Sequence, residues 1–211
     1  MHRRRPFIDW ERPMHITIKV RDRERYGHFR HSGFRPHFRR AIRNAHDKGL
    51  HIIHFSVQMN HIHFLVETES RFVLHRALKS LNTTLAIALK RFRTEVLQLK
   101  NERGRVFQDR YHLHVLHSPR ATRNALRYVL LNSAKHLRSP RPTVCLHSTA
   151  ALFREWGALF GNSWRAFFLI PKRETILAAR ARLTTLELSA PVSELLRVRW
   201  REVPPILPFY A

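Results

Sequence analysis

The sequence is poor in cysteine and has no long apolar run. The only cysteine, Cys145, excludes an intramolecular disulfide and a cysteine-rich zinc site, so we interpret it as a small packing residue in a reducing compartment. No run of about 18 apolar residues occurs, and the basic N-terminal segment lacks the apolar core of a signal peptide. We therefore expect a cytoplasmic protein that does not enter a membrane.

Acidic residues are also scarce relative to basic ones. The chain has 39 Lys and Arg against 15 Asp and Glu, which gives a net charge of +24. A charge of this size over a whole chain predicts a polyanionic partner and favours nucleic acid. Because 44% of the residues are hydrophobic, the chain can still bury a core, which excludes a disordered basic tail.

The apolar pattern predicts a run of strands and helices over the first two thirds of the chain. Strands, indicated by alternating or β-branched residues, are predicted at 14–20, 50–57, 61–67 and 111–117. Helices, indicated by three- and four-residue apolar spacing, are predicted at 34–48, 72–97 and 120–137. The order predicts an α+β fold, the ferredoxin-like split βαβ unit, in which an antiparallel sheet carries its helices on one face.

Local signals support two of these helix boundaries. Gly49 is expected to end the first helix, and Ser118-Pro119 supplies an N-cap and a first-turn proline for the helix that follows. After Pro142 the pattern weakens, with possible helices at 143–164 and 173–188 and a short apolar-basic piece after them. We therefore divide the chain into a domain at 1–142 and a helical C-terminal extension at 143–211.

Two histidines lie two residues apart on the third predicted strand. Side chains at i and i+2 share a strand face, so His61 and His63 can converge on one divalent cation. A chain with 16 histidines also contains such pairs by chance. His112 and His114 form another pair, which we interpret as phosphate contacts or ordinary strand residues rather than part of the site. Glu67 shares the parity of the first pair, but its place at the strand end suggests a surface charge.

The helix at 120–137 offers a nucleophile and a further ligand. Tyr128 and Asn132 are four residues apart and so share a helical face. If this helix crosses the sheet face that presents His61 and His63, the Asn132 amide oxygen could reach the cation with Tyr128 beside it. Three protein ligands would leave coordination positions for a phosphate oxygen and water. The structural alternatives are an aromatic that anchors its helix and an amide that bonds to backbone.

Three segments in this order resemble a known family: RPMHITIKV, VQMNHIHFLVE and DRYHLHVLHSPRATRNALRYVLLNSAKH. They resemble the single-tyrosine HUH transposases, closest to the REP-associated tyrosine transposases of bacteria. The resemblance implies His61 and His63 as the metal pair, Tyr128 as the nucleophile and Asn132 as the side chain that completes coordination. It also implies Mg²⁺ or Mn²⁺ as the cofactor, and single-stranded DNA with a hairpin, such as a REP-like palindrome, as the substrate.

The implied activity is cleavage of DNA near hairpins through a 5′-phosphotyrosine intermediate, followed by strand rejoining, in transposition or in REP-element processing at the nucleoid. A tyrosine has an ordinary pKa near 10, so Tyr128 would need positive charge or a base nearby. Minimal family members work as dimers that share sites. Because the extension departs from that minimal pattern, we favour a monomer.

Arginines on two predicted helices are candidates for phosphate contact. They are Arg39, Arg40 and Arg43 on the first helix and Arg120, Arg123 and Arg127 around the third. Aromatic residues interleaved with basic ones could stack unpaired bases, although core packing explains them at least as well. These are Trp10, Tyr26, Phe29 and Phe34.

Two other functions fit the same composition. The first is a non-catalytic nucleic-acid-binding protein derived from a transposase. The second is a metal-independent endoribonuclease on a ferredoxin-like scaffold, with histidines as acid and base. The endoribonuclease predicts cleavage that resists EDTA, requires a 2′-hydroxyl in the substrate and forms no covalent intermediate.

Overall fold

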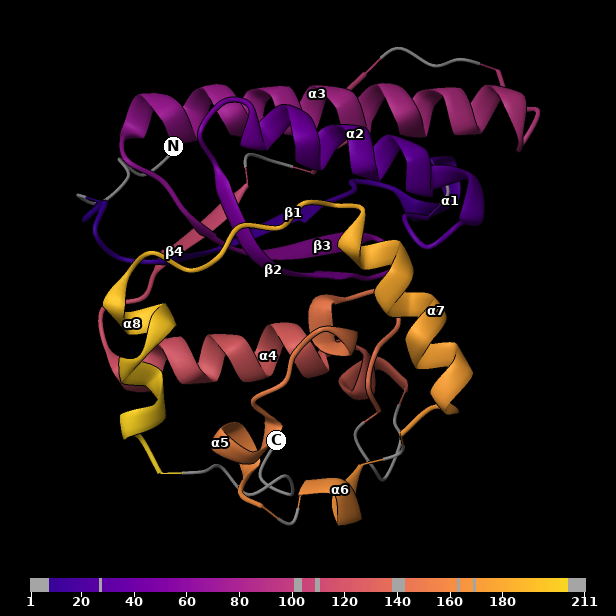
Figure 1. Ribbon diagram of the computed structural model, residues 1–211. Coiled ribbons are helices and arrows are strands. Elements are labelled where there is room, and N and C mark those ends of the chain that lie inside the picture. The colour runs from indigo at the N-terminus through magenta and orange to yellow at the C-terminus, as the bar shows by residue number, and fades with distance from the viewer. Residues whose placement is uncertain are drawn as a thin grey trace.

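A four-stranded antiparallel sheet forms the centre of the computed structural model, which describes residues 8–26, 28–100, 104–108, 111–137, 143–162, 164–168 and 170–204 (Figure 1). The strands are Met14–Lys19 (β1), His51–Val57 (β2), His61–Glu67 (β3) and His112–Val115 (β4). Their order is β2-β3-β1-β4, with every neighbouring pair antiparallel. This is the sheet of a split βαβ unit, so the predicted fold class is confirmed.

Two helices, Arg35–His46 (α2) and Arg71–Glu95 (α3), cover one face of the sheet (Figure 1). Gly49 ends the α2 segment with a φ of +82°, as predicted, and an added Cβ there would lie 3.0 Å from a methyl carbon of Val73. Ser70 caps α3, because its Oγ accepts a hydrogen bond of 3.3 Å from the Val73 N–H. These helices form the layer that the sequence predicts.

The segment between β1 and α2 contains a short helix, Arg23–Tyr26 (α1), and a 3₁₀ turn at Ser32–Phe34, neither of which the sequence predicted. Tyr26, Phe29 and Phe34 are buried in the core beneath α2 and α3, and Trp10 packs against that core. Core packing therefore explains these aromatic residues.

The helix Pro119–Leu137 (α4) lies on the opposite face of the sheet (Figure 1). Ser118 caps it as predicted, because the Ala121 N–H donates to Ser118 Oγ at 3.1 Å. Leu126 and Val129 are buried in a hydrophobic cluster with Leu65 of β3. The sheet thus lies between the α2 and α3 layer and α4.

The helix predicted at 173–188 is present but ends four residues early, and the other helices in the described residues after 142 are short. The helices of this part are Trp156–Phe160 (α5), Trp164–Phe167 (α6), Arg173–Thr184 (α7), Glu194–Arg197 (α8) and 3₁₀ turns at Thr149–Ala151 and Arg199–Glu202. The prediction of one helix at 143–164 is wrong: residues 143–155 contain no helix except a 3₁₀ turn, α5 is five residues long, and Gly161, with a φ of +84°, ends it. Cys145 is buried, as expected of a packing residue.

The extension runs along the edge strand β2. The Val57 N–H donates to the His147 carbonyl at 2.9 Å, and the Ser189 N–H donates to the Ile52 carbonyl at 3.1 Å. Backbone groups on an open strand edge would otherwise be available to another chain. The extension thus covers the edge of the sheet.

Two charged side chains fix the extension in place, and both overturn expectations from the sequence. Arg123 is fully buried and donates to carbonyl oxygens of the extension, including Trp200 and Leu159 at 3.0 Å each, so it cannot contact DNA here. Glu67 is not a surface charge. Its buried carboxylate accepts hydrogen bonds from the Val192 N–H at 2.6 Å and the Ser193 N–H at 3.1 Å.

No helix in the described ranges has the length and hydrophobicity needed to span a bilayer.

Candidate active site

His61 and His63 lie on the face of β3 toward α4. The residues that alternate with them, Ile62 and Phe64, are buried in the core beneath α2 and α3. The centroids of the two imidazole rings are 4.7 Å apart. The i and i+2 spacing therefore brings the two rings together, as the sequence predicted.

Neighbouring side chains hold the Nδ1 side of both imidazoles. His61 Nδ1 lies 2.8 Å from Asn60 Oδ1, and because an amide oxygen only accepts, this Nδ1 carries the proton. His63 Nδ1 lies 2.9 Å from Thr17 Oγ1 and 3.1 Å from His15 Nε2. Histidines that ligate a metal through Nε2 are commonly oriented by such contacts at Nδ1.

Tyr128 and Asn132 come to this face from α4. The Tyr128 ring centroid lies 5.0 Å from that of His63, and the side chain is 40% exposed, so a large substrate can reach it. Asn132, one turn further along, is only 2% exposed. Its side-chain oxygen and nitrogen have no hydrogen-bond partner among the described residues.

A divalent cation fits these residues. The buried Asn132 amide has no hydrogen-bond partner among the described residues, which is costly, and a cation bound to its oxygen would offset that cost. Within the described ranges, no group of three or more His, Cys, Asp or Glu side chains could hold a metal ion. A metal at this face would therefore depend on the mixed donor set of His61, His63 and Asn132.

Sequence reasoning missed His15 and Thr17, which β1 places beside the pair. The alternation in MHITIKV puts both on one face, and the register sets Thr17 directly opposite His63. The alternation was a signal that they share a face, whereas their position beside His63 follows only from the register. Burial, and then the nearby His114 and His112, lower the pKa of His15 to about 4, so its imidazole is neutral at pH 7.

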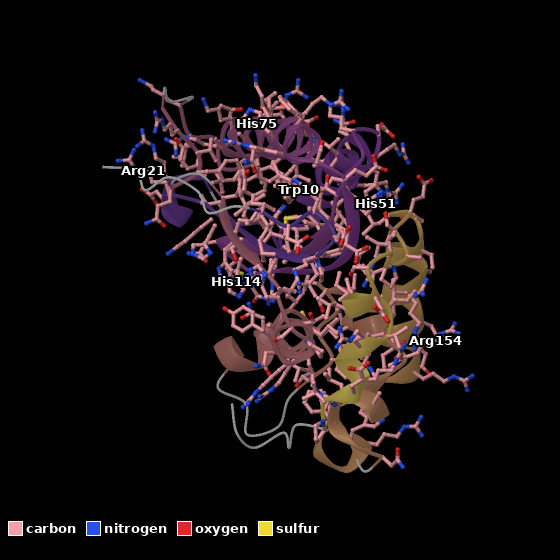
Figure 2. The ribbon with its side chains drawn as sticks, turned by 90° about the vertical axis from the view of Figure 1, so that its left-hand side faces the viewer. Trp10, Arg21, His51, His75, His114 and Arg154 are labelled. Carbon is pink, nitrogen blue, oxygen red and sulfur yellow. The ribbon has the colours of Figure 1, made fainter. Side chains whose placement is uncertain are left out.

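The second histidine pair lies on the same face of the sheet. His112 pairs with Thr17 and His114 pairs with His15, and both β4 histidines are exposed. Figure 2 places His114 on the side of the sheet toward α4. The polar face therefore extends from β3 across β1 to the edge strand β4.

Residues 10–130 match the family model described as "Transposase IS200 like". The chain belongs to this family. Among solved structures, this transposase resembles one of a REP-associated tyrosine transposase bound to a REP hairpin, at 18% identity and a TM-score of 0.49, over 71% of this chain and 82% of that chain. No curated protein matches it significantly. The family match includes His61, His63 and Tyr128 and ends before Asn132 and the extension.

The arginines of the transposase that were expected to bind phosphate divide between two places. Arg120 and Arg127 line a cavity of about 400 Å³ on α4, together with Asn124, Val203 and Pro204. Arg39, Arg40 and Arg43 lie on α2, in the layer on the other face of the sheet. With Arg123 buried, the six candidates do not form one surface.

Proposed function

We propose that this chain is a metal-dependent transposase of single-stranded DNA, in which Tyr128 attacks a phosphodiester near a hairpin. The position of Tyr128 carries the proposal: its ring contacts His63, with 5.0 Å between the ring centroids, yet stays 40% exposed. An aromatic that only anchored its helix would bury its ring among apolar side chains. This ring instead lies open on the polar face of the sheet.

His61, His63 and Asn132 would hold the divalent cation, Mg²⁺ or Mn²⁺, which when bound supplies positive charge that polarises the scissile phosphodiester and favours the phenolate. The donor set favours Mn²⁺ at least as much as Mg²⁺, because Mg²⁺ prefers oxygen ligands whereas two of these donors are imidazole nitrogens.

The chain's own residues would carry the covalent steps. The Tyr128 phenolate oxygen attacks the phosphorus, the bond from phosphorus to the 3′ oxygen breaks, and that oxygen leaves as a hydroxyl after taking a proton. Arg127, next to Tyr128, and Arg120, two turns earlier on α4, would offset the charge of the phosphoryl oxygens. In the reverse step a DNA 3′-hydroxyl attacks the phosphotyrosine, so strands join without ATP.

The extension would support this chemistry within a single chain. Arg123 and Glu67 fix it to α4 and to the end of β3, so residues after 142 hold the helix that carries Tyr128. We therefore propose that residues 1–142 form the catalytic unit, that the extension supports it, and that a monomer is sufficient for cleavage.

The test is a denaturing-gel assay of wild type and Tyr128→Phe on labelled single-stranded hairpin DNA from the palindromes beside the gene. Reactions contain Mn²⁺, Mg²⁺ or EDTA. We expect a cation-dependent protein-DNA adduct that survives SDS and is absent in Tyr128→Phe. Because phenylalanine keeps the ring and removes only the hydroxyl, loss of the adduct identifies the nucleophile.

Two results would contradict the proposal. Cleavage that persists in Tyr128→Phe, resists EDTA and requires a 2′-hydroxyl would indicate the endoribonuclease. Tight binding to several hairpins with no cleavage under any cation would indicate a non-catalytic DNA-binding protein.

A further inference from the structure

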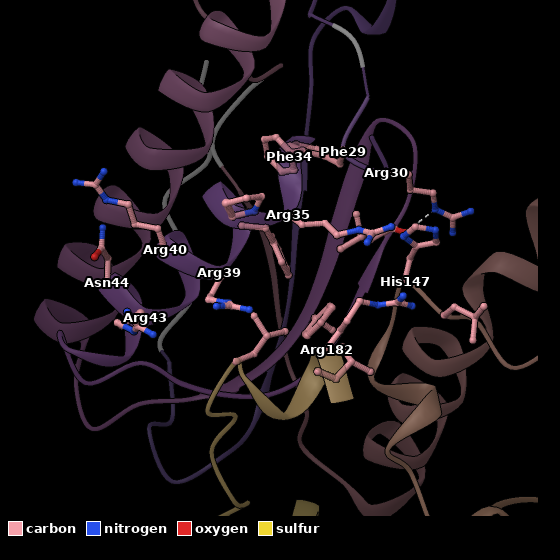
Figure 3. Close-up of a pocket in the computed structure, with 17 residues that line it drawn as sticks. Phe29, Arg30, Phe34, Arg35, Arg39, Arg40, Arg43, Asn44, His147 and Arg182 are labelled. Carbon is pink, nitrogen blue, oxygen red and sulfur yellow. Dashed lines mark hydrogen bonds between the residues drawn. The ribbon is translucent and has the colours of Figure 1, made fainter. Parts of the chain in front are cut away.

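A second basic site lies away from the candidate active site. A cavity of about 660 Å³ opens between α2, α7 and the second half of β2, next to residues 146–147 (Figure 3). Its size falls within the range of about 300–1,000 Å³ that is usual for ligand pockets. Leu146, His147, Arg182, Leu183 and Leu186 line it from the extension, beyond the residues that match the family model.

The wall of the cavity is strongly cationic. It contains Arg30, Arg35, Arg39, Arg40, Arg43 and Arg182 (Figure 3). No Asp or Glu lines it among the described residues, and α2, which supplies four of these arginines, has no acidic residue. The wall is therefore positive without compensation from carboxylates.

Most of these guanidinium groups have no partner in the described part of the protein. Arg30 is the exception, because its Nε donates to the Val57 carbonyl at 2.8 Å and its Nη2 donates to Gln58 Oε1 at 2.9 Å. The other five are exposed, and their side chains form no hydrogen bond or ion pair with any described residue. They are Arg35, Arg39, Arg40, Arg43 and Arg182. Such a set can bind several phosphate oxygens at once.

The first turn of α2 adds to this positive potential, and His147 responds to it. Burial, and then the charges of Arg30, Arg35 and Arg182, lower the pKa of His147 to about 4. The first turn of α2 also lines the cavity, with Pro36 near the helix start and no side-chain cap, so the positive end of the helix dipole adds to the arginines.

The floor of the cavity is apolar. Phe29 and Phe34 lie 5.1 Å apart between ring centroids, and Phe38 lies 5.0 Å from Phe55. The four rings belong to the core and are only 2–7% exposed, so they offer the cavity their edges rather than open faces. An apolar floor beneath a cationic rim still suits a ligand with a hydrophobic part and an anionic part. A nucleotide has this chemistry, with its base against the floor and its phosphate on the arginines.

The cavity and the candidate active site use the same pair of strands, β2 and β3. Val57, which lines the cavity, pairs with Ile62, which lies between His61 and His63 on β3. Val57 and Ile62 both belong to the core beneath α2 and α3, whereas His61 and His63 alternate with Ile62 and face α4, so the two sites lie on opposite faces of the strand pair. The extension covers the edge of β2, so a single strand that reached both sites would pass the end of the strand pair, at the turn between β2 and β3.

We propose that this cavity binds one or two unpaired nucleotides of the single-stranded DNA that continues from the hairpin, with phosphates on the α2 and α7 arginines and a base on the phenylalanine floor. The inference rests on the proposed function for its substrate. It adds a contact that would favour hairpins with single-stranded tails over hairpins without them.

The experiment is equilibrium binding by fluorescence anisotropy, in EDTA so that cleavage does not interfere. The probes are one hairpin with single-stranded tails and the same hairpin without tails. The test variant is Arg39→Gln with Arg43→Gln, and the matched control is Arg71→Gln with Arg76→Gln, two exposed arginines on α3 outside the cavity. Both variants remove the same charge from helix surfaces.

We expect the test variant to bind the tailed hairpin about 10-fold more weakly than the control variant does, and the tail-less hairpin equally well. The slope of log affinity against log salt for the tailed probe should fall by about 1.4, since each single-strand phosphate contact contributes about 0.7. Wild type should bind a hairpin with abasic tails more weakly than one with normal tails. The test variant should bind these two probes equally well.

Three results would overturn the inference. In the first, the two variants reduce the affinity for both probes equally. In the second, wild type binds hairpins with abasic tails as tightly as hairpins with normal tails. In the third, a deoxynucleoside monophosphate binds the cavity, but the tail does not change the affinity for the hairpin. Failure of the proposed function is separate. Tail-dependent binding by a protein that never cleaves would leave the cavity assignment intact, whereas normal cleavage without tail dependence would overturn the cavity assignment alone.

Discussion

The two faces of the central sheet share the same strands and differ in what those strands present. Toward α2 and α3, β1 and β3 present Ile16, Ile18 and Phe64, all buried in one apolar core. Toward α4, the alternating positions present His15, Thr17, His61 and His63, with Leu65 packing against α4 further along β3. Because side chains alternate along a strand, each strand supplies stability on one face and chemistry on the other. Adjacent substitutions should therefore have effects of different kinds.

The largest expected effect is on catalysis, from His63→Ala. Because His63 would be a metal ligand beside Tyr128, we expect the cleavage rate to fall by more than about 100-fold. The melting temperature should also fall, because His63 is buried and contacts Thr17 and His15, but by less than for the loss of an apolar core side chain. Gel assays and thermal unfolding measure the two effects. A large drop in stability with normal cleavage would contradict the division between faces.

Substitutions in the core between the sheet and the α2 and α3 layer should lower stability rather than the cleavage rate. Leu81 of α3 is fully buried in the core against the sheet. We expect Leu81→Ala to lower the free energy of unfolding by roughly 2–5 kcal/mol, because it removes apolar burial and leaves a cavity. Urea unfolding followed by circular dichroism measures this loss. The molecules that remain folded should cleave at the wild-type rate, and a specific loss of cleavage would break the comparison.

The same division explains which features could be predicted from the sequence. Alternation located β3, and the Ser118-Pro119 signal located the start of α4, because both are local patterns. Arg123 could not be distinguished from Arg120 and Arg127, since its burial depends on carbonyl groups that lie far along the chain in the extension. His15 required the register between β1 and β3, which the strand pattern alone does not fix.

A smaller effect is expected from Thr17→Val, which keeps the shape of the side chain and removes the hydroxyl 2.9 Å from His63 Nδ1. Groups that orient a metal-ligating histidine commonly contribute 10–100-fold to metal affinity or activity. We expect the Mn²⁺ concentration for half-maximal cleavage to rise by about 10-fold. Thr17→Ser restores the hydroxyl and should restore the Mn²⁺ dependence. Equal behaviour of the valine and serine variants would exclude an orienting role.

The smallest expected effect is a dependence of stability on pH at the boundary between the sheet and the extension. Burial lowers the pKa of His54 and of His147 to about 4. His54 Nδ1 lies 3.1 Å from Thr149 Oγ1, and the His147 carbonyl accepts from Val57, so both residues join the extension to β2. In the unfolded chain a histidine titrates near pH 6.5.

Below that pH the unfolded state binds more protons than the folded state, so the free energy of unfolding falls as the pH decreases toward 4. Between pH 7 and pH 6 we expect a loss of roughly 1 kcal/mol, reduced by solvent screening at the half-exposed His147. His54→Gln combined with His147→Gln should flatten this slope, whereas His75→Gln on exposed α3 should not. An unchanged slope in the double variant would mean that the acid sensitivity arises elsewhere, and that the polar side of the sheet does not depend on neutral imidazoles to hold the extension.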